Sequence, residues 1–266
     1  MLKAEQKQVQ CPLDLFLLYN HRVEILIIYE DKNIIAVNKP AGLLVHPVSM
    51  QSKTTAQPPT LTNWLVNHYP EIKDVGDPSA SSGQANNRPG IVHRLDKETS
   101  GVIIVARNQK TFEYLKNLFQ TSQIKKTYLG LVWGKVEPKS GTINKPIGLK
   151  SGTTKRTVAI KNAKMVKEAI TDYQVKKYFD KYSLLEIYPR TGRTHQIRVH
   201  LNSINHPIVG DRLYGKNPLP AGLARQFLHA ASIELNLPDN GKIKLEASLP
   251  TDLELFLKSV ELEDSQ

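Results

Sequence analysis

Cysteine is almost absent from this sequence, because Cys11 is the only one among 266 residues. A single cysteine excludes a disulfide within the chain, and with it the disulfide-rich secreted class, and it fits a reducing compartment. Long apolar runs are also missing, since none approaches the roughly 20 residues that a membrane-spanning helix needs. The first ten residues, MLKAEQKQVQ, lack the apolar core of a secretory signal. These absences predict a cytoplasmic protein that does not enter a membrane.

Acidic residues are in the minority. The chain has 36 lysines and arginines against 25 aspartates and glutamates, which gives a formal net charge of +11. An excess of this size indicates a polyanionic partner, most simply a nucleic acid. Charge alone fits a merely soluble basic protein equally well. The length allows one large domain or two small ones, and 40% hydrophobic residues are enough for a sizeable core.

One stretch, RPGIVHRLDKETSGVIIVARN at 88–108, combines charged residues with an apolar run. The run from Val102 to Ala106 is short and β-branched, which predicts a buried strand. Asp96 then lies on the loop that leads into this strand. Arg94 and Lys97 flank it, and opposite charges favour the ionised carboxylate, which can act as a nucleophile or a base. From these residue types alone, a surface acid in a local ion pair is the more common interpretation.

The amino-acid sequences of four segments change that interpretation. They are HRLDKETSGVIIVA at 93–106, NKPAGLLVHP at 38–47, KKTYLGLVWGKV at 125–136 and TGRTHQIRVHLNSINHPIVGDRLYG at 191–215. In this order they closely resemble the signatures of the RluA-type pseudouridine synthases. The resemblance covers roughly residues 25–257 and is greatest to the RluD-like branch, which acts on large-subunit ribosomal RNA. It implies isomerisation of uridine to pseudouridine within RNA, without a cofactor or a metal.

The resemblance also assigns catalytic roles. It makes Asp96 the essential catalytic residue and predicts that Arg193 forms an ion pair with it across the active-site cleft. It places Tyr128 beside the target base, as a candidate for proton transfer. Taken without the resemblance, Tyr128 is an ordinary strand tyrosine, and Arg193 is a surface arginine at the start of a helix.

Four further residues are expected to bind substrate. The resemblance implies that Arg94 helps to fill the space left by the flipped nucleotide. Ile197 is expected to line the base pocket, and Leu95 to bind the substrate. Lys39 lies beside a loop that the resemblance puts near the cleft, where it could contact a phosphate. By residue type alone, Lys39 is more often a solvated side chain.

The predicted elements mix strands and helices without βαβ alternation, which indicates an α+β domain. We expect strands at 25–29, 34–38, 102–106, 125–136, 170–179, 184–188, 231–237 and 242–247. We expect helices at 61–69, from a cap at Asn108 to 120, from a cap at Thr194, at 223–228, and from a capping box at Thr251–Glu254. The resemblance implies the pseudouridine synthase fold, a bent, mostly antiparallel mixed sheet with flanking helices and a central active-site cleft.

The domain prediction has three parts. Residues 1–24 are expected to form an N-terminal arm, with no room for the S4-type RNA-binding domain that many relatives carry. Residues 25–260 form the catalytic domain, and residues 261–266 an acidic, frayed tail. We expect a loop at 141–156, which either follows an RNA backbone or is merely solvated. Its basic residues are Lys145, Lys150, Lys155 and Arg156.

The histidines do not predict a metal site. His195 and His200 lie five residues apart, which turns them to different faces of a helix, and no cysteine or acid cluster completes a zinc shell. The expected partner is RNA, ribosomal or transfer, and we expect a monomer. A non-catalytic RNA-binding or ribosome-assembly protein remains the alternative, because a charge of +11 fits it equally well.

Overall fold

The computed structural model describes residues 25–47, 59–77, 88–239 and 241–265. The chain divides into two compact units. The first comprises Met1–Gln123 with Leu245–Ala247, and the second comprises Ile124–Lys244 with Ser248–Gln266. The expected N-terminal arm at 1–24 lies outside the described residues. In the described ranges, no helix is long and apolar enough to cross a membrane.

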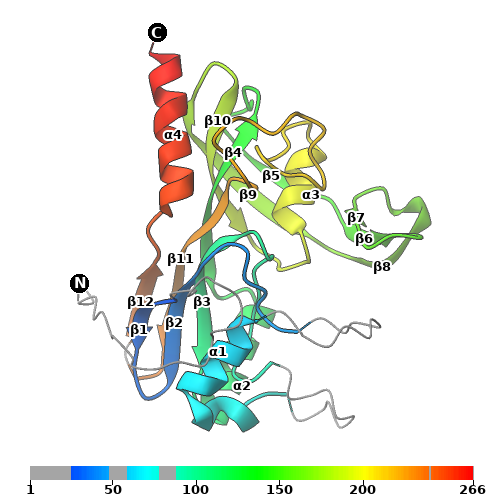
Figure 1. Cartoon of the computed structure of the whole chain (residues 1–266). Helices are drawn as coiled ribbons and strands as arrows, with labels where there is room; N and C mark the ends of the chain where they lie inside the picture. The colour runs from blue at the N-terminus through cyan, green and yellow to red at the C-terminus, as the bar shows by residue number, and fades with distance from the viewer. Residues whose placement is uncertain (1–24, 48–58, 78–87, 240, 266) are drawn as a thin grey trace. The chain divides into compact units, whose positions relative to one another are not determined.

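The first unit contains a three-stranded antiparallel sheet in the order β1-β2-β3 (Figure 1). Its strands are β1 (Leu26–Glu30), β2 (Ile34–Lys39) and β3 (Ser100–Ala106). Every side chain of β3 is buried, as its β-branched composition predicted. Residues 91–99 carry Asp96 and lead directly into β3. The sheet therefore holds one end of the loop that carries Asp96.

The helices of the first unit are α1 (Leu61–His68), the 3-10 helix η1 (Pro70–Asp74) and α2 (Gln109–Gln120). Asn108 caps α2, because its side chain accepts a hydrogen bond from the N–H of Thr111, as predicted. Trp64 of α1 does not belong to the core, because its side chain is only partly buried and stacks on His68. The buried face of α1 is made by Leu61, Thr62 and Leu65 instead.

The second unit contains a larger antiparallel sheet in the order β11-β4-β10-β9-β5, with β12 paired to β11. The strands are β4 (Lys125–Trp133), β5 (Ser140–Asn144), β9 (Ile170–Tyr178), β10 (Tyr182–Pro189), β11 (Leu228–Leu237) and β12 (Gly241–Glu246). Two clusters of buried apolar side chains pack against this sheet. β4 therefore has apolar contacts on both faces.

The prediction of a loop at 141–156 was wrong. This segment contributes to β5 and to a small sheet, β7-β6-β8, which projects beside α3 in Figure 1. The small sheet comprises β6 (Ile147–Lys150), β7 (Arg156–Thr157) and β8 (Ala163–Lys167), with the 3-10 helix η3 (Ile160–Asn162) between β7 and β8. Gly141 misled the prediction: a Cβ there would lie 2.7 Å from the hydroxyl of Tyr173, so this glycine permits close strand packing and makes no turn.

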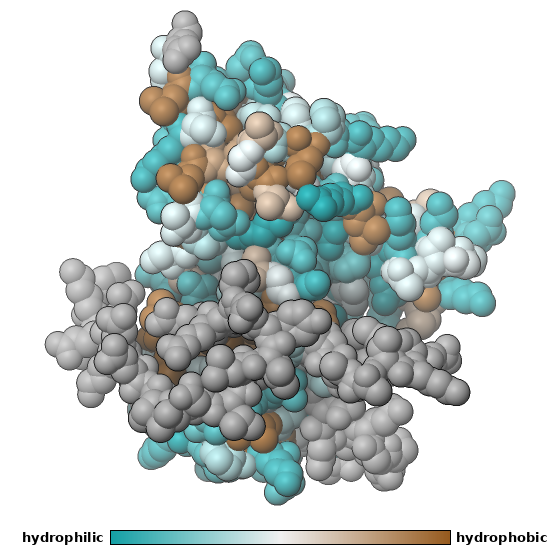
Figure 2. All heavy atoms as spheres, in the orientation of Figure 1, coloured by the Kyte–Doolittle hydropathy of each residue, from teal (hydrophilic) through white to brown (hydrophobic). Residues whose placement is uncertain are grey.

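The two helices of the second unit are α3 (Gln196–Asn202) and α4 (Thr251–Asp264). The predicted caps were wrong. The N-cap of α3 is His195, in the left-handed conformation, and the N-cap of α4 is Pro250; neither makes a side-chain capping bond. Residues 261–264, predicted as a frayed tail, continue α4. Figure 2 shows apolar side chains on the face that includes α4, where Leu255 and Leu262 are exposed.

The short helix expected at 223–228 is not formed: residues 223–227 are irregular, with a bend at Arg225, and β11 begins at Leu228. Leu223 and Phe227 are nevertheless buried against Leu253 and Phe256 of α4. The apolar spacing that predicted a helix therefore marks burial in the core. The α+β class and the mostly antiparallel pairing are as predicted.

Candidate active site

The Asp96 loop lies along β3 and is fixed to it at two points. Ile91 forms a bridge with Val105, and the Nε2 atom of His93 accepts a hydrogen bond of 2.9 Å from the N–H of Ile104. Leu95 is buried, with 4% of its surface exposed, while Asp96 beside it is half-buried. The sequence therefore places one carboxylate on a loop whose neighbours are anchored to a buried strand.

Gly90 makes the approach of this loop to β3 possible. Its φ of +67° lies in the left-handed region, and a Cβ at this position would lie 2.4 Å from the carbonyl oxygen of Ala106. The Gly90 carbonyl also accepts a hydrogen bond from the N–H of Ala106, at 2.9 Å. A larger residue would push the loop away from the strand, so the position requires glycine.

Lys39 lies beside the loop after β2, as expected, but its ammonium is not open to a phosphate. Its side chain is fully buried, at 0% exposure, and its ammonium donates three hydrogen bonds. The accepting carbonyls belong to Pro40, Leu43 and Lys97, at 2.7, 2.9 and 3.0 Å. Three acceptors use all the donors of an ammonium group, which leaves none for a phosphate. Lys39 instead ties the loop after β2 to the residue that follows Asp96.

A second contact joins the same two loops, because the N–H of Gly42 donates to the carbonyl of Lys97 at 2.9 Å. Arg94 lies on the exposed side of the Asp96 loop and contacts the Nε2 atom of His46, at 3.3 Å. The first unit thus brings together four of the predicted site residues, Lys39, Arg94, Leu95 and Asp96. Three of them remain open to a substrate role, and Lys39 is a structural support.

Tyr128 and Ile197, from the second unit, belong to one apolar cluster. Tyr128 lies on β4 opposite Ile187 of β10 and is half-buried, while Ile197 lies on α3 and is 7% exposed. Alternation along β4 places Tyr128 on the face opposite Leu131. It still packs on apolar residues, since both faces of β4 are covered.

Arg193 is held by backbone contacts just before α3. Its Nε donates to the carbonyl of Glu168 at 2.9 Å, and its N–H donates to the Oε1 of Gln196 at 3.0 Å. The Gln196 side chain is buried; it also accepts from the hydroxyl of Thr191 and donates to the carbonyl of Ile170. The turn that presents Arg193 is therefore fixed by one buried amide, which sequence analysis did not find.

Lys126 is a second cation in the neighbourhood of Arg193. Burial, together with the positive charge of Arg193, lowers the pKa of Lys126 to about 8. Lys126 lies two residues before Tyr128 on β4, so the two side chains share one face of the strand. The second unit therefore offers a tyrosine and two cations, of which sequence analysis named only Tyr128 and Arg193.

Other side chains in and next to α3 contact neighbouring segments of the second unit. Arg198 forms a buried two-point ion pair with Asp211, at 2.7 and 2.9 Å. Burial by itself raises the pKa of Asp211, but the hydrogen bonds and charge of Arg198 outweigh it and hold that pKa below its usual range. His195 contacts the Tyr214 hydroxyl, and His200 the Thr171 hydroxyl. Within the described ranges no cluster of histidines, cysteines and acids could hold a metal.

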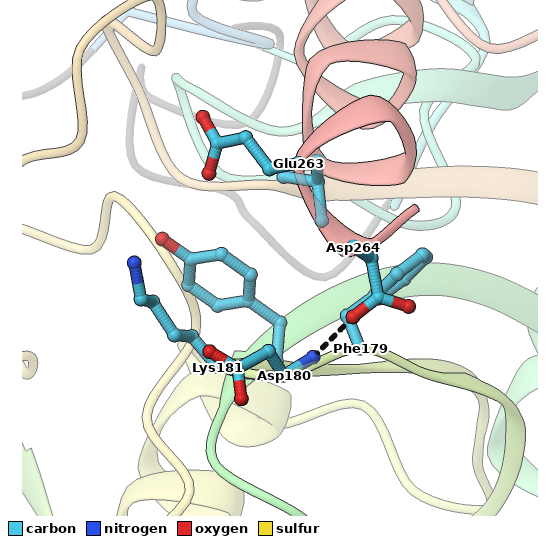
Figure 3. Close-up of a pocket in the computed structure, with 7 residues that line it drawn as sticks. Phe179, Asp180, Lys181, Glu263 and Asp264 are labelled. Atoms are coloured by element: carbon cyan, nitrogen blue, oxygen red, sulfur yellow. Dashed lines mark hydrogen bonds between the residues drawn. The ribbon is translucent and has the colours of Figure 1, made fainter. Parts of the chain in front are cut away.

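A shallow pocket in the second unit lies at the end of α4 (Figure 3). The N–H of Asp180, in the turn between β9 and β10, donates to the carboxylate of Asp264 at 2.6 Å. Lys181 and Glu263 lie at its rim in the same view. No predicted site residue lines this pocket. The contact between Asp180 and Asp264 anchors the end of α4 to the turn between β9 and β10.

The chain resembles known proteins over most of its length. Residues 33–203 match the model of a family described as RNA pseudouridylate synthase. An uncharacterized RNA pseudouridine synthase of Chloroflexus aurantiacus is 40% identical over 225 residues, which are 84% of this chain and 66% of that protein. The ribosomal large subunit pseudouridine synthase D of Nitrosomonas europaea is 39% identical over 252 residues, 91% of this chain and 67% of that protein. The chain thus spans about two thirds of the length of these relatives.

A solved structure has a similar fold. The human protein RNA Pseudouridylate Synthase Domain Containing 4 superposes with a TM-score of 0.65 and 26% identity. The match covers 88% of this chain and 92% of that one. It confirms the fold that the motifs at 38–47, 93–106, 125–136 and 191–215 predicted.

Proposed function

Because the chain belongs to the RNA pseudouridylate synthase family, we propose that it isomerises uridine to pseudouridine within large-subunit ribosomal RNA. The observation that carries the proposal is the Asp96 loop: a single carboxylate within the HRLD motif, on a segment anchored to buried β3 and tied through Lys97 to buried Lys39. Charge-driven RNA binding alone has no need of a carboxylate fixed in this way.

The reaction rearranges atoms without adding any. The N1–C1′ glycosidic bond breaks, the uracil rotates, and C5 bonds to C1′; C5 then loses its proton while N1 gains one. Asp96 either attacks C1′ covalently or takes the proton from C2′ to give a glycal. Both routes need an ionised carboxylate, and the family resemblance assigns this task to Arg193, whose guanidinium stabilises and orients the group.

The remaining residues act on the base and the strand. Tyr128 packs on the uracil and helps remove the C5 proton. Leu95 and Ile197 border the base. The target nucleotide has to leave its stack to reach such a site, as in other enzymes that modify a base, and Arg94 takes part of the vacated space.

The basic surface holds the RNA backbone. The small sheet carries many cations, and Figure 2 shows it as mostly hydrophilic. Lys150 is exposed there, whereas Lys145 and Lys155 also donate to the carbonyls of Ser203 and Leu213. Phosphate contacts of this kind are independent of sequence, so loop structure and shape select the site. We further propose that the protein works as a monomer in the cytoplasm.

Ribosomal RNA is supported by the names of relatives such as the synthase D of Nitrosomonas europaea. Transfer RNA is the other substrate with the same chemistry. The test is to map pseudouridine across both RNAs in cells that lack the protein, with rescue by the wild type or by Asp96→Asn.

Three results distinguish the possibilities. Loss of large-subunit sites that only the wild type restores supports the proposal in full. Loss of transfer-RNA sites alone keeps the chemistry and overturns the substrate. If no site changes, also after removal of related synthases, the chain is a non-catalytic RNA-binding protein.

A further inference from the structure

Three basic side chains gather beside the Asp96 loop in the first unit. Arg88 and Arg94 both lie on this loop and are exposed, and His46 comes from the segment after β2 and is buried, at 5% exposure. A guanidinium N–H of Arg94 lies 3.3 Å from the Nε2 atom of His46. Arg94 precedes the proposed catalytic Asp96 by two residues on the same loop.

His46 serves this group as a neutral hydrogen-bond acceptor. A guanidinium only donates, so Nε2 has to accept and the ring hydrogen is placed on Nδ1. Nδ1 is buried and has no hydrogen-bond partner among the described residues, which destabilises the ring at this position. Burial, together with the charges of Arg88 and Arg94, lowers the pKa of His46 to about 4, so the ring stays uncharged at neutral pH.

The two arginines lie close enough to repel each other. The Arg88 side chain is exposed but loses part of its hydration, and this loss together with the charge of Arg94 lowers its pKa. The turn at Gly90 fixes Arg88, because the Arg88 carbonyl accepts from the N–H of Ile91 at 3.1 Å. Two neighbouring guanidinium groups can share one anion between them. Phosphate matches the fork of N–H donors of a guanidinium best.

We propose that Arg88 and Arg94 bind the RNA backbone phosphate that adjoins the space vacated by the target uridine, which Arg94 partly fills, and that His46 is the positioning residue that holds the Arg94 guanidinium. The inference rests on the proposed function for the identity of the anion. It adds to that function a second phosphate ligand, Arg88, and a residue that orients Arg94 before RNA arrives. A protein with an acidic surface would be the other kind of partner, and the test separates the two.

The test measures RNA binding in the Asp96→Asn background, with an in vitro transcript of large-subunit ribosomal RNA as the probe, over a range of salt concentrations. Each phosphate contact contributes about 0.7–0.9 to the slope of log affinity against log salt. Arg88→Ala and Arg94→Ala should each reduce the slope by about this amount. Lys258→Ala, which removes an exposed charge on α4, is the matched control and should leave the slope unchanged.

His46 is tested by a double-mutant cycle. His46→Phe keeps a flat ring but removes the acceptor, so we expect roughly fivefold weaker binding, equivalent to one hydrogen bond of about 1 kcal/mol. In the Arg94→Ala background the same substitution should have no effect, because the group that His46 holds is gone. His46→Gln keeps a hydrogen-bond acceptor, so it should restore the RNA affinity that His46→Phe loses. It also tests the positioning role if His46→Phe folds poorly.

Unchanged slopes for both arginine variants overturn the phosphate site, and with normal RNA binding they point to a protein partner. An equal loss from His46→Phe in both backgrounds overturns the positioning role and reduces His46 to packing. Failure of the proposed function is seen separately. If the wild type binds the transcript with these slopes but isomerises no uridine, the phosphate site stands and the enzyme proposal fails.

Discussion

At the scale of single residues, the proposed mechanism depends on one carboxylate. Asp96→Asn keeps the size of the side chain but removes the nucleophile or base. We expect turnover to fall by roughly 10²–10⁴-fold or more, with RNA binding retained. Release of tritium from RNA labelled at uracil C5 measures the turnover. Glu98→Gln makes the same chemical change two residues away and should stay within about threefold of wild type; equal losses in both variants would contradict the assignment.

Lys126 presents the opposite situation, a charge that costs stability. Because burial and Arg193 lower its pKa to about 8, the charged form of Lys126 is destabilised in the folded chain at neutral pH. Lys126→Met should therefore raise the free energy of unfolding by about 1 kcal/mol at pH 7 while it weakens RNA binding. Denaturant titration measures the first effect and filter binding the second.

The pH dependence of this gain follows from the direction of the shift. Between about pH 8 and the ordinary lysine value of 10.5, the unfolded chain holds a proton that the folded chain has lost, so wild-type stability rises with pH. The advantage of Lys126→Met should therefore shrink above pH 8. A gain that is constant from pH 7 to pH 10 would show that Lys126 is not desolvated.

At the scale of elements, prediction succeeded where the local signal was strong. The β-branched run of β3 and the Asn108 cap of α2 are encoded within a few residues. It failed where tertiary contacts decide. The short strands β6 and β7 have too few residues for a period to show, and α3 starts at a left-handed His195 that the Tyr214 hydroxyl supports. The motifs located the candidate site, but the buried roles of Lys39, His46 and Gln196 depend on contacts that no local pattern encodes.

Gln196 tests how α3 presents Arg193. Gln196→Met keeps the volume but removes both the acceptor for the Arg193 N–H and the donor to the Ile170 carbonyl. We expect a loss of about 2 kcal/mol in stability and a fall in kcat larger than the change in KM, because Arg193 loses its fixed orientation. Asn202→Met, at the exposed end of the same helix, is the control and should change neither.

A merely structural role for Gln196 makes a different prediction. The fall in kcat would then be the same in an Arg193→Ala background, whereas a role that acts through Arg193 gives no further fall there. Single-turnover rates at saturating RNA, measured at a temperature where every variant is folded, separate the two cases.

At the scale of the whole molecule, the two units carry separate reporters and separate acid-sensitive groups. Trp64 lies in the first unit and Trp133 in the second, and the sequence has no other tryptophan. Burial lowers the pKa of His46 in the first unit to about 4, and it lowers the pKa of His200 in the second. Each unit therefore contains a histidine that folding keeps neutral.

Acid should thus weaken both units, and the contribution of the first can be isolated. Between pH 6.5 and about 4 the unfolded chain binds a proton at His46 that the folded chain does not, so stability falls as pH drops through this window and changes no further from His46 below it. The loss is up to about 3 kcal/mol. In a Trp133→Phe variant, denaturant titrations followed by Trp64 fluorescence should show this loss, and His46→Gln should remove most of it.

The matching Trp64→Phe variant, followed by Trp133, shows whether the units unfold apart. If they do, His46→Gln leaves the acid sensitivity of the second unit unchanged, because groups of that unit such as His200 and Asp211 cause it. If both tryptophans report the same rescue, the units unfold as one cooperative structure. An acid response that His46→Gln alters at neither tryptophan would contradict the buried neutral histidine, and with it the acceptor on which the orientation of Arg94 depends.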